Sequence, residues 1–153
     1  MSSPSSSSKG GRPQGTRPGA KPAAAPGAAP GARTLMIVDD DDKVCQVLKK
    51  GFEHAGYRVL VADNGLKLVA TLRTDPVDAV LLDINMPWVS GLQVGRAIKA
   101  DPGLAHIKVI YITGLPGQEE ECRQNGGDGF FQKPPKLAEL LSTLRLLLAP
   151  PPG

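Results

Sequence analysis

The sequence predicts an α/β fold, a doubly wound five-stranded parallel sheet with helices on both faces. From Thr34 onward, short apolar runs alternate with segments of helical period, which is the pattern of strand–helix–strand units. The early runs are apolar throughout, as expected for strands that are covered on both sides. Turn residues such as Asn64-Gly65 and Asp101-Pro102 separate the periodic segments. The 153 residues leave room for one domain of ordinary size.

Five short runs rich in Leu, Ile, Val or Phe predict the strands. They are Leu35–Val38, Val59–Ala62, Ala79–Leu82, Val109–Ile112 and the brief Phe130–Phe131. Because a helical segment lies between each run and the next, the sheet is expected to be parallel.

Five segments with apolar residues at helical spacing predict the helices. They are Asp42–Ala55, Leu66–Arg73, Leu92–Ala100, Gln118–Asn125 and Lys136–Leu148. In the last segment, leucines at spacings i, i+3, i+4 and i+7 form one apolar stripe for packing on the sheet. The Glu-rich fourth segment is weakly helical, so we expect this helix to be short or frayed.

The charge of the chain divides at residue 33. Residues 1–33 hold five basic residues, no acidic residue and no Leu, Ile, Val or aromatic residue, so this segment is expected to be a disordered tail. Residues 34–148, the expected domain, and the short C-terminal tail 149–153 together hold 13 basic against 15 acidic residues. The excess of positive charge therefore belongs to the tail, and the folded part has no general attraction to nucleic acid.

The two cysteines, Cys45 and Cys122, lack the spacing of a metal site, and no secretory signal precedes them. Free thiols in a reducing compartment are therefore expected, and with them a cytoplasmic location. No apolar stretch approaches the roughly 18 residues of a membrane-spanning helix. Since the chain ends directly after the last predicted helix, we expect no DNA-binding output domain.

Polar residues follow the predicted strands at their carboxyl ends. Asp39 and Asp40 follow the first strand, Asp83 follows the third, Thr113 ends the fourth, and Lys133 follows the fifth. Ligands of open parallel sheets bind beyond these ends, so the side chains are expected to converge there. Taken singly, each acid would more often be a turn or capping residue, but their joint pattern favours a functional site.

Clustered carboxylates repel one another, and a hard divalent cation with oxygen ligands relieves this repulsion. The sequence therefore predicts a Mg²⁺ site. A carboxylate beside bound Mg²⁺ can attack a phosphoryl group to give an acyl phosphate, for which Thr113 and Lys133 are suitable donors. Asp41 and Asp42 are assigned to the start of the following helix, where acidic side chains favour the helix dipole.

Four runs of residues resemble the receiver domain of two-component response regulators. They are Leu35-Met-Ile-Val-Asp-Asp-Asp, Asp78-Ala-Val-Leu-Leu-Asp-Ile-Asn-Met-Pro, Val109-Ile-Tyr-Ile-Thr-Gly and Gly129-Phe-Phe-Gln-Lys-Pro. The resemblance extends from about Thr34 to Leu148. It implies a flavodoxin-like fold with strand order 2-1-3-4-5.

By this resemblance, Asp83 is the phospho-acceptor. Asp39 and Asp40 are the acidic pair that binds Mg²⁺, with Asp83 and the backbone carbonyl of Asn85 as further ligands.

The resemblance also implies that Thr113 is the switch hydroxyl, that Lys133 binds the phosphate and that the Lys133–Pro134 peptide bond is cis. Phe130 is the implied switch aromatic, although it could simply be a core residue, and it lacks the hydroxyl of the more usual Tyr. Trp88 stands where the family usually has a small residue, and it is either an anchor for a partner or a local cover.

We therefore expect a phosphorylation-controlled signalling switch and not a metabolic enzyme. Its partners would be a histidine kinase or histidine phosphotransfer protein and a downstream target protein, and a homodimer is possible. One alternative is a docking module that signals without phosphorylation, through Trp88 or the fourth helix. A second is a small Mg²⁺-dependent phosphatase or phosphotransferase, against which the chain offers no cap or substrate domain.

Overall fold

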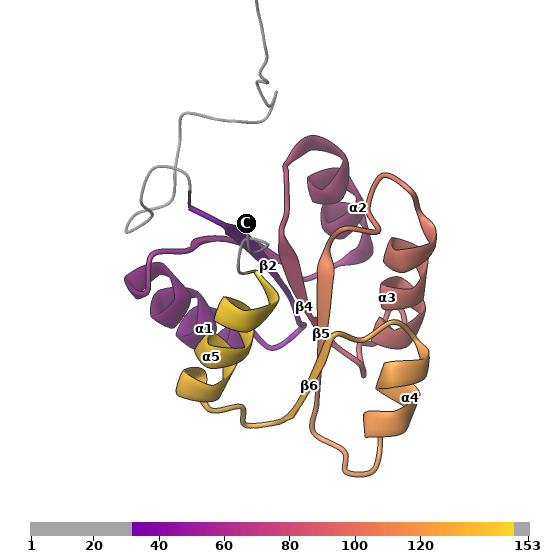
Figure 1. Ribbon diagram of the computed structural model, residues 1–153. Helices are drawn as coiled ribbons and strands as arrows, with labels where there is room; N and C mark the ends of the chain where they lie inside the picture. The colour runs from indigo at the N-terminus through magenta and orange to yellow at the C-terminus, as the bar shows by residue number, and fades with distance from the viewer. Residues whose placement is uncertain (1–31, 149–153) are drawn as a thin grey trace, which may run out of the picture.

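The computed structural model describes residues 32–148, which form a five-stranded parallel sheet flanked by helices (Figure 1). The strands are β2 (Thr34–Val38), β3 (Arg58–Ala62), β4 (Ala79–Asp83), β5 (Lys108–Thr113) and β6 (Gly129–Gln132). Their order across the sheet is β3-β2-β4-β5-β6, which in chain order is 2-1-3-4-5. The expected fold class and strand order are confirmed.

The helices that connect the strands also lie where the sequence predicts them. They are α1 (Asp42–His54), α2 (Gly65–Thr74), α3 (Gly91–Ala100), α4 (Glu119–Gln124) and α5 (Leu137–Leu147). At six residues, α4 is the short helix that its Glu-rich sequence leads us to expect. None of the helices in residues 32–148 is long and apolar enough to cross a membrane.

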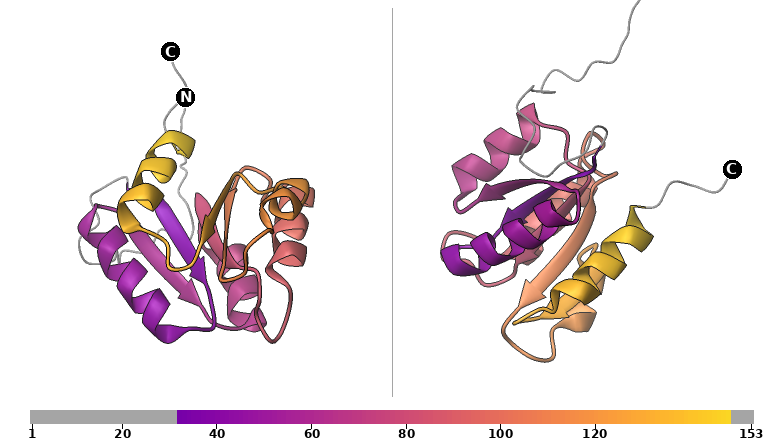
Figure 2. Two further views of the ribbon diagram at one scale, coloured as in Figure 1. Left: turned by 90° about the horizontal axis from the view of Figure 1, so that it is seen from below. Right: turned by 90° about the vertical axis from the view of Figure 1, so that its left-hand side faces the viewer.

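The sheet separates two layers of helices. Helices α1 and α5 cover one face, and α2, α3 and α4 cover the other (Figure 2, left). Along β2, Leu35 and Ile37 pack in the core beneath α1 and α5, whereas Met36 and Val38 pack in the core beneath the other helices. This alternation follows from the period of two in a strand, and burial on both sides explains why the run is apolar throughout.

Side-chain caps fix the starts of the first three helices. The Asp41 carboxylate accepts hydrogen bonds from the backbone N–H groups of Lys43 and Val44 at the start of α1. Asn64 caps α2 and Ser90 caps α3 in the same way. Asp41 therefore has the structural role that its sequence position suggests.

The turn from β4 into α3 is tight, and Gly91 makes it possible. The Gly91 amide donates a hydrogen bond to the Ile84 carbonyl at 2.9 Å, and a Cβ atom at this position would overlap the Asp83 carbonyl oxygen. The start of α3 therefore packs directly on the end of β4, beside Asp83.

The expected tails, residues 1–33 and 149–153, lie outside the described residues except for Ala32 and Arg33. The Arg33 carbonyl accepts a hydrogen bond of 3.0 Å from the Arg58 amide at the start of β3, and its guanidinium lies 3.5 Å from Asp78.

Candidate functional site

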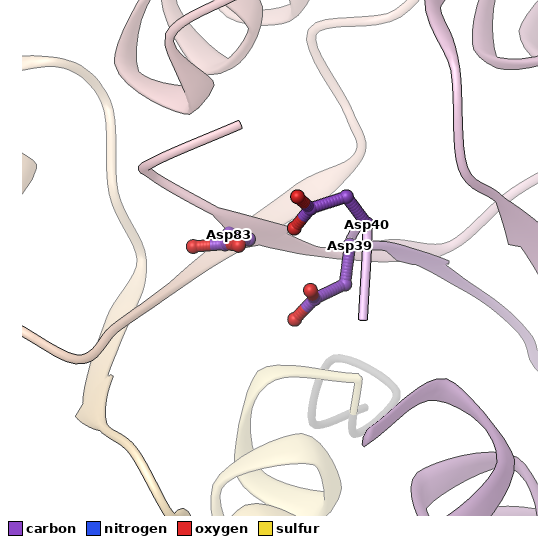
Figure 3. A group of neighbouring side chains, drawn as sticks. All are labelled: Asp39, Asp40 and Asp83. Atoms are coloured by element: carbon purple, nitrogen blue, oxygen red, sulfur yellow. The ribbon is translucent and has the colours of Figure 1, made fainter. Parts of the chain in front are cut away.

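Three carboxylates from two neighbouring strand ends lie together at one edge of the sheet (Figure 3). Asp39 and Asp40 follow β2, and Asp83 ends β4, the strand beside it. One carboxylate oxygen of each lies within 4.8 Å of the other two. Asp39 and Asp83 are buried, with 3% and 5% of their surface exposed, and Asp40 is exposed. The structure thus brings together the acids that the strand ends predict.

The two buried carboxylates are oriented by their own backbone. Asp39 Oδ1 accepts a hydrogen bond of 2.9 Å from the Asp41 amide, and Asp83 Oδ1 accepts one of 3.1 Å from the Asn85 amide. In both cases the donor lies two residues further along, as in an Asx turn. The Oδ2 atom of each carboxylate remains for interactions across the site.

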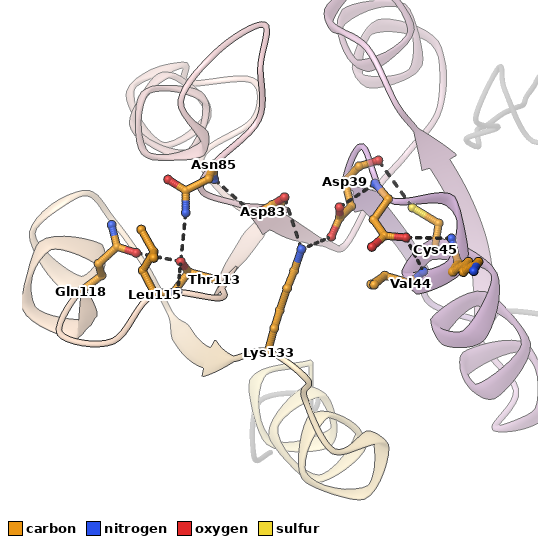
Figure 4. A network of polar contacts seen from close by, with 11 residues as sticks. Asp39, Val44, Cys45, Asp83, Asn85, Thr113, Leu115, Gln118 and Lys133 are labelled. Carbon is orange, nitrogen blue, oxygen red and sulfur yellow. Dashed lines mark hydrogen bonds and ion pairs between the residues drawn. The ribbon is translucent and has the colours of Figure 1, made fainter.

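Lys133 pairs with both of these Oδ2 atoms (Figure 4). Its Nζ lies 2.9 Å from Asp39 Oδ2 and 3.3 Å from Asp83 Oδ2. The Lys133 amide donates a hydrogen bond of 2.7 Å to the Thr113 carbonyl, which ties this residue to the end of β5. The Lys133–Pro134 peptide bond is cis, which confirms the expectation from the resemblance.

The electrostatics of the site reflect an excess of acid over base. Burial, reinforced by the negative charge of Asp39, raises the pKa of Asp83, although the Asn85 amide and Lys133 oppose this shift. For Lys133, burial alone lowers the pKa, but the hydrogen bond and charge of Asp39, together with Asp83, raise it overall. One ammonium thus serves two buried carboxylates, and the third, Asp40, stands beside them.

This donor set fits Mg²⁺. Magnesium prefers hard oxygen ligands and binds through carboxylates together with water, and three carboxylate groups converge here within reach of one ion. The site opens onto a cleft of about 880 Å³, lined among others by Asp40, Asn85 and Lys133. Such an opening admits both hydrated ions and a phosphoryl group.

The Thr113 side chain is fully buried at the end of β5, and its hydroxyl is engaged on three sides. It accepts hydrogen bonds from Asn85 Nδ2 at 3.2 Å and from the Leu115 amide at 3.1 Å, and it donates one to Gln118 Oε1 at 2.7 Å. Nothing in the sequence singles out Gln118, because a Gln before a weak helix carries no signal of its own. The family resemblance assigns a role to the backbone carbonyl of Asn85 and none to its side chain, which bonds to Thr113.

The two aromatic residues singled out by the sequence are both partly buried. Phe130 packs against the core beneath α2, α3 and α4, and it pairs with Tyr111 in the sheet register. Trp88 packs against the same core and covers Gly65, where an added Cβ would lie 3.4 Å from Trp88 Cε3. Of the two alternatives for Trp88, this packing favours a local cover.

Comparison with known proteins agrees with this geometry. The sequence profile of the response regulator receiver domain matches residues 35–145. The polar-differentiation response regulator DivK of Brucella anthropi is 33% identical over 118 residues, which cover 76% of this chain and 96% of DivK.

Two solved structures share this fold, and their sequences are identical to this chain to a similar extent. A putative response regulator from Chloroflexus aurantiacus is 26% identical with a TM-score of 0.73, covering 78% of this chain and 99% of its own. The response regulator TrrA of Thermotoga maritima, crystallised in complex with Mg²⁺ and BeF, is 27% identical with a TM-score of 0.68, covering 76% and 99%. With its fold, its strand-end acids and these matches, the chain belongs to the response regulator receiver domain family.

Proposed function

We propose that the protein is a phosphorylation-dependent switch of a two-component system, in which Asp83 accepts a phosphoryl group from a histidine kinase or a histidine phosphotransfer protein. The observation that carries this proposal is the meeting of Asp39, Asp40, Asp83 and Lys133 at one open edge of the sheet. A buried carboxylate with a shared ammonium, beside two further acids, suits phosphoryl transfer to an aspartate.

Mg²⁺ would be held by the carboxylates of Asp39, Asp40 and Asp83 and by the backbone carbonyl of Asn85. When bound there, the ion supplies positive charge that offsets the negative charge of the phosphoryl oxygens. The excess of carboxylate over ammonium among the described residues supports this assignment.

The residues of the chain itself supply the nucleophile and the donors. A carboxylate oxygen of Asp83 attacks phosphorus, the phosphorus–nitrogen bond to the donor imidazole breaks, and the imidazole leaves with the electron pair. The product is an acyl phosphate. Lys133, already 3.3 Å from Asp83, is placed to hold a phosphoryl oxygen, and the Thr113 hydroxyl is the second donor that we assign.

The acyl phosphate would then be read by a downstream partner through Thr113, Phe130 and the surface of α4 and α5. Thr113 supports this proposal because it is bonded both to the β4–α3 loop and to the residue before α4. The buried, unpaired thiols of Cys45 and Cys122 suit the reducing cytoplasm in which we place this signalling.

Labelling with radioactive acetyl phosphate tests the proposal. We expect the protein to be labelled in Mg²⁺, the label to be lost with EDTA, and Asp83→Asn to remain unlabelled. Asp63→Asn is the matched control, because Asp63 is an exposed acid after β3. Equal labelling of Asp83→Asn and the wild type would refute the assignment. Sustained release of phosphate from small phosphoesters would instead support the phosphotransferase alternative.

A further inference from the structure

The Thr113 hydroxyl has no hydrogen-bonding capacity left. A hydroxyl offers one proton and two lone pairs. The amide groups of Asn85 and Leu115 occupy the lone pairs, and the Gln118 carbonyl oxygen takes the proton in the shortest of the three bonds, at 2.7 Å (Figure 4). A phosphoryl oxygen is an acceptor, so it can bond to Thr113 only by taking this proton.

We propose that Gln118 is a positioning residue that holds the Thr113 proton, so that a phosphoryl group on Asp83 must displace Gln118 before Thr113 can bind it. This inference rests on the proposed function of Asp83 and Thr113. It makes Gln118 a competitor of the phosphoryl group, and breaking its bond to Thr113 is the first structural event after phosphorylation.

The position of Gln118 supports this role. It directly precedes α4 as the N-cap residue, but its side chain makes no capping hydrogen bond to the helix. Its polar group is used on Thr113 instead, across the β5–α4 loop. Losing this bond therefore leaves the backbone hydrogen bonds at the ends of α4 unchanged. The link between the site and the start of α4 is removed.

The other end of α4 is held by a different residue of the same strand. The Tyr111 hydroxyl donates a hydrogen bond of 2.7 Å to the carbonyl of Asn125, the C-cap residue of α4. Tyr111 and Thr113 are two residues apart on β5 and so point to the same face of the sheet. Displacing Gln118 releases the start of α4, while Tyr111 keeps hold of its end, so the expected motion is a pivot about Asn125.

The test uses beryllofluoride with Mg²⁺ as the probe, because it mimics a phosphoryl group on aspartate. Gln118→Met keeps the length and flexibility of the side chain but removes the acceptor, and Gln118→Glu keeps an acceptor. The net contribution of one hydrogen bond corresponds to about a fivefold change in affinity. We therefore expect Gln118→Met to bind beryllofluoride about fivefold more tightly than the wild type.

The control variants separate this role from a general effect on α4. Gln118→Glu restores the acceptor and is expected to bind no more tightly than the wild type. Gln124→Met, on the exposed last turn of α4, is the matched control and should leave the affinity unchanged. Circular dichroism melting checks that all variants are folded. Tighter binding by Gln118→Glu, equal to that of Gln118→Met, would overturn the inference.

A second readout examines the bond without any ligand. Nuclear magnetic resonance couplings of the Thr113 side chain should show one rotamer in the wild type and in Gln118→Glu, and a mixture in Gln118→Met. If the wild type binds beryllofluoride but Gln118→Met binds equally well, the positioning role is wrong and the proposed function stands. If the wild type fails to bind it, the proposed function is wrong, and the role of Gln118 falls with it.

Discussion

Asp83 is a destabilising residue in the metal-free protein. Burial and the neighbouring Asp39 raise its pKa in the folded state above that of the unfolded chain. The folded state is therefore penalised where Asp83 is ionised, above its folded pKa, and the penalty disappears as the pH falls below the unfolded pKa. A carboxylate held under such conditions is typical of a site where stability is sacrificed for function.

The substitution Asp83→Asn is thus expected to raise the free energy of unfolding at pH 7, without Mg²⁺, by about 1 kcal/mol. Lys133 keeps Asp39 as a partner at 2.9 Å in this variant. Urea unfolding at several pH values measures the effect, which should shrink toward pH 3. Asp63→Asn, the exposed control, should be neutral, and a destabilised Asp83→Asn would contradict the electrostatic account.

Asp40 differs from the other two acids because it is exposed and, among residues 32–148, forms no ion pair with Lys133. Removing its charge should weaken Mg²⁺ binding without disturbing the Lys133 pairs. We expect Asp40→Asn to lower the affinity for Mg²⁺ by at least about tenfold, the scale seen when groups around a bound metal are altered.

Titration of Mg²⁺ followed by the fluorescence of Trp88 measures this affinity, and isothermal titration calorimetry provides an independent value. The melting temperature of the metal-free variant should match that of the wild type. An unchanged affinity in Asp40→Asn would remove this residue from the proposed set of ligands.

At the level of single residues, the sequence predicts the acids and Lys133 because strand ends are easily located and parallel strands bring their ends to one edge. Gln118 could not be found this way. Its bond to Thr113 depends on the path of the loop from Gly114 to Gly117, which neither periodicity nor turn residues define. The residue roles themselves came from the family resemblance.

Among the elements, β5 and its Tyr111 join the helices of one layer. Tyr111 is fully buried, its hydroxyl bonds to the carbonyl of Asn125 at the end of α4, and the hydroxyl also lies against Gly95 of α3. Burial raises the pKa of Tyr111 to about 12. A tyrosine on this strand therefore serves both the packing of α3 and the position of α4.

The variant Tyr111→Phe should lose about 1 to 2 kcal/mol of unfolding free energy at pH 8, because the Asn125 carbonyl loses its donor. Since the pKa in the folded state exceeds the usual value of about 10, the advantage of Tyr over Phe is complete below pH 10 and is lost as the pH rises toward 12. Denaturant unfolding from pH 8 to pH 11 measures it. Tyr57→Phe is the control, and a difference independent of pH would contradict the role of the buried hydroxyl.

The bounds of the elements were predictable to about one residue, since Gly, Pro, Asn and Asp punctuate the chain between apolar runs. The order of the strands was predicted by the family resemblance alone, because periodicity shows which residues face the core and leaves open which strands are neighbours. The short β6 had the weakest sequence signal of the five strands, since only two phenylalanines indicate it. They pack in opposite cores, Phe130 on one face of the sheet and Phe131 on the other.

At the scale of the whole molecule, each of the two cysteines serves as a probe of one layer of helices. Cys45 lies in the core beneath α1 and α5, and Cys122 lies in the opposite core. Burial, with nearby acids, raises the pKa of Cys45 to about 12 and that of Cys122 to about 11. At pH 8 both thiols are therefore protonated and covered, and neither is poised for reaction.

We expect a thiol reagent such as dithionitrobenzoate to modify neither cysteine on mixing with the folded protein at pH 8. The slow reaction of Cys45→Ala then reports the exposure of Cys122, and that of Cys122→Ala reports the exposure of Cys45. Comparing the two rates shows whether the two layers open together. Equal rates are expected if the sheet unfolds as one cooperative unit. Immediate modification of Cys122 would instead show that α4 opens independently of the rest.

The ammonium of Lys133 also has a meaning for biosynthesis. It directly follows β6, the last strand of the described sheet to be synthesised, whereas the acids that it pairs with are made 94 and 50 residues earlier. A nascent or prematurely terminated chain that lacks this lysine would hold a cluster of negative charge with no counterion of its own. Under the function proposed above, a chain that stops before Lys133 would lack the ammonium assigned to the phosphoryl oxygen and is expected not to respond to a phosphoryl donor.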